Sequence, residues 1–261
     1  STYGEINTWD VSLITDMSLL FLGATNFNDD IGNWDVSNVT TMSRMFEQAN
    51  SFNQDLSNWD VSTVTALSYM FRYANSFNGD ISTWNVSSAE STTNMFIGAT
   101  NFNGDISSWD VSSVESTTRM FQSAESFNQD LSSWDVSNVT NMGDMFKYAS
   151  NFDGDISSWD VSGVINMFEM FEGASSFNQD ISGWDVSSVT NMTNMFLNAA
   201  ALSDENKCAI HTSFSSNDNW PYDWSGLCFS PQTTEDLQAA VDMWVDDNES
   251  ALSTYGEINT W

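Results

Sequence analysis

Apolar residues recur along most of this chain with a period of 25 residues. Tryptophan marks the period most clearly, and valine, phenylalanine and alanine keep the same phase. The recurring tryptophans are Trp9, Trp34, Trp59, Trp84, Trp109, Trp134, Trp159 and Trp184. Eight units in register predict a repeat protein in which each unit packs mainly on its two neighbours.

Each unit contains two hydrophobic patterns. In the stretch Ile31-x-x-Trp34-x-Val36, the last two side chains are two residues apart and share one face of a predicted short strand. The next apolar residues are spaced three and four apart, which predicts a helix of about three turns. They are Val39, Met42, Met45, Phe46 and Ala49.

A short strand and a short helix cannot bury their apolar faces alone, but stacked units can. The predicted fold class is therefore α/β: a right-handed leucine-rich-repeat-like solenoid of eight 25-residue strand–helix repeats over residues 1–202. A parallel sheet is expected on one side, with helices on the other and a cap at each end. The tryptophan ladder is interpreted as core and not as a carbohydrate-binding strip.

The consensus FNQDIS-x-WDVS-x-VT-x-M-x-x-MF-x-x-A, seen from Phe177 to Ala199, resembles the BspA-like leucine-rich-repeat proteins. The resemblance covers about residues 5 to 202, with departures at Asn85, Thr92 and Thr117. These microbial proteins are secreted or surface-attached, many have no known function, and some are implicated in adhesion. The resemblance implies an extracellular or cell-surface location but identifies no ligand.

The period breaks after Ala199, and residues 203–229 are predicted to form a C-terminal cap. A helix is expected through Cys208, with the aromatic residues of the segment 220–224 lying over the last repeat. The two cysteines, Cys208 and Cys228, suggest one disulfide and an oxidising compartment. Two buried free thiols are the alternative.

Residues 230–252 are predicted to form a helical linker. The final segment, Ser253–Trp261, is identical to Ser1–Trp9, which gives a second, larger period of 252 residues (253 − 1). A second tandem copy is therefore expected to begin at Ser253, with its first strand near Ile258, and the linker helix would cap that copy. An engineered overlap is the alternative explanation.

The chain is strongly acidic, with 5 Lys and Arg against 36 Asp and Glu and a formal net charge of −31. This charge argues against nucleic acid as a partner, because phosphates would be repelled. No apolar run is long enough for direct membrane insertion. An acidic, hydroxyl-rich surface suits salty or calcium-containing external media, although solubility alone would also explain it.

A row of aspartates follows the tryptophans and is predicted to face outward. Its members are Asp10, Asp35, Asp60, Asp110, Asp135, Asp160 and Asp185. Stacking would bring like charges about 5 Å apart, at a cost of roughly 3 kcal/mol per pair for an effective dielectric near 20. A row of bound Ca²⁺ on the six from Asp35 onward would offset this cost. Hydrogen bonds from nearby serines and turn N–H groups are the preferred explanation, and no cofactor is required.

Candidate N-glycosylation sequons begin at Asn38, Asn85, Asn138, Asn191 and Asn248. Candidate catalytic groups are few. His211 is the single histidine, and it has no nucleophile motif around it. The sequence therefore predicts a protein that is not an enzyme.

The leading functional hypothesis is a structural building block of an extracellular filament or surface fibre made of tandem 252-residue units. Its expected partners are further copies of itself, in tandem and in lateral self-association. The alternative is a cell-surface adhesin that binds a host or matrix protein or glycan through the strand face.

Overall fold

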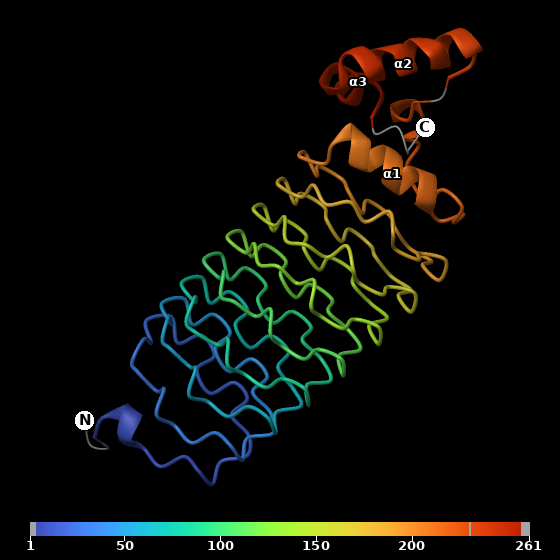
Figure 1. The fold of residues 1–261 in the computed structure, drawn as a ribbon. Helices are drawn as coiled ribbons and strands as arrows, with labels where there is room; N and C mark the ends of the chain where they lie inside the picture. The colour runs from blue at the N-terminus through green and yellow to red at the C-terminus, as the bar shows by residue number, and fades with distance from the viewer. Residues whose placement is uncertain (1–3, 230, 257–261) are drawn as a thin grey trace.

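The computed structural model describes residues 4–229 and 231–256. Figure 1 shows a stack of irregular coils, with the N-terminus at one end and three helices at the other. The helices are α1 (Asp204–Phe214), α2 (Thr234–Asp246) and α3 (Asn248–Tyr255). Two short 3₁₀ turns, η1 (Ile6–Thr8) and η2 (Ser225–Leu227), complete the regular elements. We call each 25-residue coil a rung; rung 1 covers residues 6–30 and rung 8 covers 181–205.

The predicted fold class is wrong. The described residues form no β-sheet, and no helix lies within residues 9–203, so the structure is not a leucine-rich-repeat-like solenoid of strands and helices. Neighbouring rungs are instead joined by isolated parallel bridges, one residue long and 25 residues apart. The bridges link Asp16, Thr41, Ala66, Ser91, Ser116, Asn141, Asn166 and Asn191 in series.

Backbone hydrogen bonding explains why the predicted helix does not form. The Met45 N–H donates within its rung to the Met42 carbonyl at 3.1 Å, but the Arg44 and Phe46 N–H groups donate to the next rung. Arg44 and Gln48 also have φ of 60° and 61°, and their equivalents in the other rungs also have positive φ. An α-helix needs negative φ and a bond from each N–H to the carbonyl four residues back. The spacing of three and four instead reflects successive turns that direct the same side chains inward.

The predicted strand is absent for a related reason. The Trp34 N–H donates to the Ile31 carbonyl at 3.1 Å, and the Val39 N–H donates to the Val36 carbonyl at 2.9 Å. Both bonds close four-residue turns and prevent an extended conformation. The apolar side chains of this segment are nevertheless buried.

Stacked aromatic rings fill the interior of the rungs. Within one rung, the ring centroids of Phe46 and Phe52 lie 4.0 Å apart. Between rungs, Phe46 stacks on Phe71 at 5.5 Å, and Phe52 stacks on Phe77 at 6.0 Å. Each such pair contributes about 0.5–1.5 kcal/mol beyond its buried area. Two phenylalanine columns therefore run along the core.

A tryptophan column tethers each rung to the one before it. Each indole N–H donates to the carbonyl of the first residue of the preceding rung, at 2.9 to 3.2 Å. The donors are Trp34, Trp59, Trp84, Trp109, Trp134, Trp159 and Trp184. These seven side chains are 2–4% exposed, whereas Trp9 is 42% exposed. The prediction of a core position for Trp9 is therefore wrong, because no rung covers it.

An asparagine ladder, which the sequence reasoning missed, joins the rungs on another side. The Asn53 N–H donates to the side-chain oxygen of Asn28 at 2.8 Å, and the Asn78 N–H donates to that of Asn53 at 2.8 Å. The series continues to Ser203, with Asp153 replacing asparagine in one rung. Each side chain thus supplies the acceptor that the next rung's backbone needs.

The C-terminal cap closes the last rung. Ser203 caps the N-terminus of helix α1, and its side chain accepts a hydrogen bond from the Asn206 N–H. The rings of Trp220, Tyr222 and Trp224 pack against Phe196. The final helical segment differs from the prediction of one helix over 230–252. It forms α2 and α3, separated at Asp247, and α3 runs on to Tyr255. The strand predicted from Ile258 lies outside the described residues.

Replacing Trp109 by phenylalanine should destabilise the chain by about 2 kcal/mol. The change removes the hydrogen bond to the Ile81 carbonyl and leaves unfilled volume in the core. Chemical denaturation measures the loss. Trp9→Phe is the matched control and should cost much less, because Trp9 is 42% exposed. Equal losses at both positions would contradict the proposed role of the buried indole column.

Two buried hydroxyls should be dispensable. Thr92 and Thr117 are 0% and 1% exposed, and among the described residues neither Oγ1 has a hydrogen-bond partner. The variants Thr92→Val and Thr117→Val keep the side-chain shape, so each should stabilise the chain by about 1 kcal/mol. Thr93→Val is the control without such a gain, since the Thr93 hydroxyl is hydrogen-bonded to Ser91. A loss of stability at Thr92 and Thr117 would show that these hydroxyls are paired in solution.

Candidate functional site

The outward aspartate row is held by local hydrogen bonds to serine. The Asp35 Oδ1 accepts both the backbone N–H of Ser37, at 3.1 Å, and its hydroxyl, at 2.6 Å. Asp60 and Ser62 repeat this pair, at 3.0 and 2.6 Å. The same two bonds recur at Asp10, Asp110, Asp135 and Asp160, and Asp185 accepts the backbone N–H of Ser187 at 2.9 Å. Each aspartate therefore stabilises the turn that follows it.

These bonds lower the pKa of several aspartates in the row. The serine hydroxyl, followed by the serine N–H, lowers the pKa of Asp35, and the charges of Asp10 and Asp60 oppose the shift. The pKa of Asp160 is lowered by the same two bonds to Ser162. Hydrogen bonding thus outweighs repulsion between rungs. Asn85 accepts the Ser87 N–H at 3.1 Å, so this turn does not require a charge.

The aspartate row offers carboxylates to a cation one rung at a time. No group of three or more His, Cys, Asp or Glu side chains gathers at one point within residues 4–229 and 231–256. Each rung except the fourth, which has Asn85, contributes one exposed carboxylate to the row, and carboxylates such as those of Asp35 and Asp60 already bind serine through one oxygen. Ca²⁺ takes six to eight oxygen ligands. Calcium on Asp35, Asp60, Asp110, Asp135, Asp160 and Asp185 stays a prediction, to be tested by chelation.

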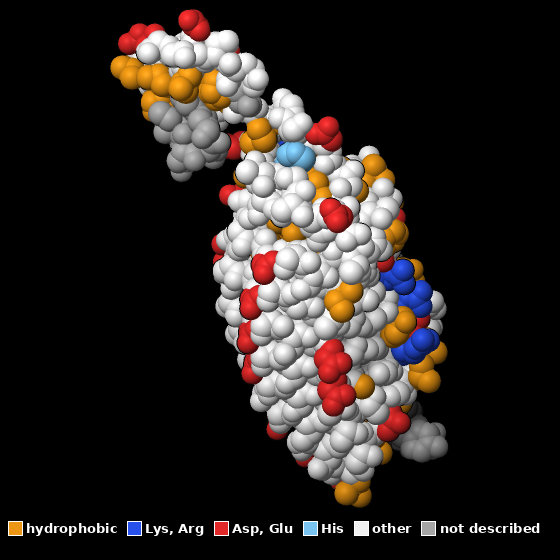
Figure 2. Space-filling view, turned by 90° about the vertical axis from the view of Figure 1, so that its right-hand side faces the viewer, with side chains coloured by type: hydrophobic (Ala, Val, Ile, Leu, Met, Phe, Trp, Pro, Cys, Tyr) orange, Lys and Arg blue, Asp and Glu red, His pale blue; other side chains and the backbone are white. Residues whose placement is uncertain are grey.

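A cationic groove is the most distinctive surface feature, and sequence reasoning did not predict it. Four of the five Lys and Arg residues lie on one flank of an otherwise acidic molecule (Figure 2). We call this surface the arginine–tyrosine groove, and it has a volume of about 450 Å³. Its main side chains are Arg44, Tyr69, Arg72, Tyr73, Arg119 and Lys147. The four cations occupy only two positions of the 25-residue period, a signal that was available in the sequence.

Aromatic rings and buried acids fix the cations of this groove. The guanidinium of Arg44 lies 4.6 Å from the ring centroid of Tyr69, and that of Arg72 lies 4.7 Å from the ring of Tyr73. Arg72 also donates to the buried carboxylate of Glu47 at 2.7 Å. The Arg44 side chain is 46% exposed, so its charge stays accessible to a ligand.

The second half of the groove is an ion-pair network around Lys147. Its Nζ contacts Glu169, and it pairs with Glu172 at 2.9 Å and with Asp144 at 3.8 Å. Burial alone would lower the pKa of Lys147, but the bonds to Glu169 and Glu172 outweigh it and raise that pKa. Burial raises the pKa of Asp144 against the opposing charges of Arg119 and Lys147. The side chain of Arg119, 3.1 Å from Asp144, is 50% exposed.

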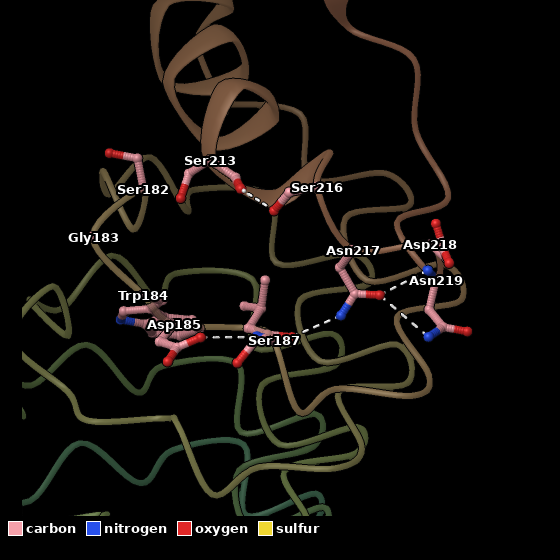
Figure 3. Close-up of a pocket in the computed structure, with 11 residues that line it drawn as sticks. Ser182, Gly183, Trp184, Asp185, Ser187, Ser213, Ser216, Asn217, Asp218 and Asn219 are labelled. Atoms are coloured by element: carbon pink, nitrogen blue, oxygen red, sulfur yellow. Dashed lines mark hydrogen bonds between the residues drawn. The ribbon is translucent and has the colours of Figure 1, made fainter.

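A polar pocket of about 600 Å³ lies between the last rung and the cap (Figure 3). The Asn217 side-chain nitrogen donates to the carbonyls of Val186 and Val189 at 2.7 and 2.9 Å. In rung 3, the Thr63 hydroxyl donates to the equivalent Val39 carbonyl at 2.8 Å. Asn217 therefore makes the hydrogen bond to Val189 that a side chain of a ninth rung would make. Serines and two aspartates line the pocket, without a histidine to act as a base.

The remaining candidate residues serve the cap. Cys208 and Cys228 form a disulfide that joins α1 to the end of η2. His211 Nδ1 accepts the indole N–H of Trp220 at 3.0 Å, which ties the histidine to the packing of the cap. Among the described residues, no helix has both the length and the apolar character needed to cross a membrane.

The sequon asparagines have unequal surroundings. Asn38 and Asn138 are exposed, but each side-chain nitrogen donates to a carbonyl of the preceding rung, at 2.9 and 2.8 Å. Asn85 and Asn191 accept N–H groups two residues ahead, and Asn191 is only partly exposed. Asn248 is exposed at the start of α3. Glycosylation at these sites stays a prediction.

The aspartate row should make stability depend on pH. Hydrogen bonds lower the folded-state pKa of Asp35, Asp60 and Asp135 below the ordinary value of 3.8, so the stability they contribute is present above that value. It is lost as pH falls through the lowered folded pKa. We expect a melting temperature that holds down to about pH 5 and then falls between about pH 4 and 2.

The control is a variant in which the three partner serines, Ser37, Ser62 and Ser137, are replaced by alanine. It should show a shallower fall between about pH 4 and 2, because the side-chain bonds that lower the pKa are gone. Thermal melts followed by circular dichroism measure both proteins. The same pH dependence in both would contradict this role of the serines.

Comparison with known proteins places the chain in a family without assigning it an activity. The model of the family described as "Mycoplasma protein of unknown function, DUF285" matches residues 1–109 and again residues 90–209. No curated protein matches the chain, and no solved structure does. The two family matches together span residues 1–209 of 261, and the chain therefore belongs to this DUF285 family.

Proposed function

We propose that this chain is a non-catalytic structural unit of an extracellular filament or surface fibre, built from tandem units of 252 residues. The observation that carries the proposal is uniformity along one axis. Most junctions between rungs repeat the same indole–carbonyl bond, the same asparagine bond and the same ring stacks. Such a stack gains stability from each added neighbour and suits a load-bearing rod.

The tandem arrangement is supported by the sequence itself. The segment Ser253–Trp261 repeats Ser1–Trp9 without a change, 252 residues later. Chance is a poor explanation for nine identical residues in a row, one of them Trp and one Tyr. A chain of such units would place rods in series, each followed by its own cap and helical pair.

Two features support an extracellular location. A disulfide persists in oxidising compartments, and Cys208 and Cys228 are joined by one. A formal net charge of −31 keeps a repetitive rod soluble and discourages nonspecific collapse of neighbouring rods. Both features also agree with the resemblance to BspA-like surface proteins.

The non-catalytic part of the proposal rests on the groups that catalysis would need. His211 accepts the Trp220 indole N–H, and Cys208 is part of the disulfide. The serines of the pocket in Figure 3 lie beside Asp185 and Asp218, and the described residues that line this pocket include no histidine, cysteine or lysine.

Adhesion is the second candidate function, and the arginine–tyrosine groove favours it. Exposed guanidinium groups beside tyrosine rings can bind an anionic glycan or an acidic protein segment. The groove is formed by the segments of each repeat that were predicted to be helical. An adhesive surface would therefore lie on these segments and not on the predicted strands. An adhesin would use the stack as a spacer for this groove.

Negative-stain electron microscopy of the native, full-length material, with and without chelator, separates these functions. The filament proposal predicts long fibres with a regular axial repeat. Fibres that collapse in chelator would assign calcium to the aspartate row, and unchanged fibres would remove that hypothesis. Short, isolated rods would contradict the filament and favour an adhesin whose ligand occupies the groove.

A further inference from the structure

The two ends of the stack differ in how well they are covered. At the C-terminal end, Phe196 lies beneath the rings of the cap and is 6% exposed. At the N-terminal end, Ile14 and Leu20 are 44% and 51% exposed, although their equivalents one rung later are fully buried. A concave apolar surface, lined by Trp9, Asp10, Val11 and Ile14, opens on this end. Rung 1 therefore presents uncovered core.

Rung 1 also has exposed apolar side chains at positions that are mostly polar in the other rungs. Leu13, Leu19 and Leu22 are 90%, 49% and 45% exposed. They occupy positions at which the later rungs are mostly polar, with some of those polar side chains buried, such as Glu47 and Asp144. The residues at the position of Leu13 are Asn38, Thr63, Ser88, Ser113, Asn138, Gly163 and Ser188. The leucines thus enlarge the apolar end of the stack beyond its core, which is the composition of a docking surface.

The helical pair α2–α3 carries a matching apolar surface. Ala240 and Ala251 are buried where the pair packs. Leu237, Val241 and Val245 follow one another at intervals of four on α2, and the first and last are 41% and 76% exposed. Figure 2 shows hydrophobic side chains in a stripe along this helical pair, away from the body of the stack. Among the described residues, the apolar side chains of Leu237 and Val245 on this stripe stay exposed.

We infer that the α2–α3 pair of one 252-residue unit covers rung 1 of the next unit in the same chain. The inference rests on the proposed tandem arrangement and adds the joint that would make it rigid. Tyr255, at the end of α3, aligns with Tyr3, so Leu13 of the next unit lies ten residues beyond it. Ten residues span at most roughly 33 Å, which brings α2–α3 within reach of that rung.

The side chains of rung 1, and not its backbone, favour a helical cover over a further rung. In rung 2, the carbonyls of Thr41, Ser43 and Met45 accept N–H groups from rung 1. The leucines of rung 1 would not match the outward polar positions of a stacked rung, but they match a helix with an apolar stripe. The cover also stops the open end from pairing with other chains, which an exposed row of carbonyls otherwise invites.

Cysteine labelling in a two-unit chain, residues 1–252 followed by residues 1–261, tests the joint. Leu13→Cys is placed in either the first or the second unit, and the rate of reaction with a bulky maleimide is measured. The native cysteines stay in their disulfides. We expect at least ten-fold slower labelling in the second unit, where α2–α3 precedes rung 1. The matched control is Ser113→Cys, at the equivalent exposed position of rung 5, which should react equally in both units.

A second pair of variants assigns the protection to α2. Leu237→Asp with Val245→Asp in the first unit should restore fast labelling of Leu13→Cys in the second unit. The same two changes in the second unit should have no effect on that rate. Fast labelling of Leu13→Cys in both units, in chains without the two aspartate substitutions, would overturn the inference. The inference would also be overturned if labelling of Leu13→Cys in the single 261-residue chain slowed as protein concentration rose. Rung 1 would then be covered by another chain.

These outcomes are independent of the proposed filament. Electron microscopy of the native material tests whether fibres form, whereas the labelling test reports only whether the joint is closed. Fibres with equal labelling in both units would retain the filament and discard this joint.

Discussion

The fold depends on hydrogen bonds that leave one rung and end on the next. An indole N–H reaches a carbonyl 28 residues earlier, and asparagine oxygens accept N–H groups 25 residues later. Alternate backbone N–H groups between residues 42 and 48 also donate to the next rung. Because these N–H groups donate to the next rung, too few remain within one rung to form the hydrogen bonds of an α-helix. The regularity of the stack therefore comes from hydrogen bonds between neighbouring rungs and not from local secondary structure.

Charge is arranged around this axis in a way that agrees with a rod. Aspartates along the outside keep their charge, since the hydroxyl and N–H of a serine stabilise an ionised carboxylate such as that of Asp35 and lower its pKa. The few cations gather in the arginine–tyrosine groove, where Glu47, Asp144 and Glu172 partly neutralise them. The cations thus form a groove on one flank of the stack, and an adhesin would bind its ligand there.

The sequence predicted the 25-residue repeat and most of its inward side chains, because a spacing of 25 and a spacing of three or four are visible in the residues. It could not predict the backbone that presents them. Positive φ at Arg44 and Gln48 is unusual for such residues, and successive turns bury Met42, Met45 and Phe46 on the same face that a helix would. The asparagine ladder and the groove were missed for a different reason, since both depend on contacts between rungs. The four cations share two positions of the period, and comparing rungs column by column would have found them.

The most direct test of this account is nuclear magnetic resonance measurement of hydrogen exchange at the tryptophan indole N–H groups. The account predicts seven strongly protected indole protons, those of Trp34 to Trp184, because each is buried and bonded to a carbonyl of the preceding rung. Exchange at the rate of a free indole for most of these seven would contradict it, since the rungs would then lack the bond that sets their register.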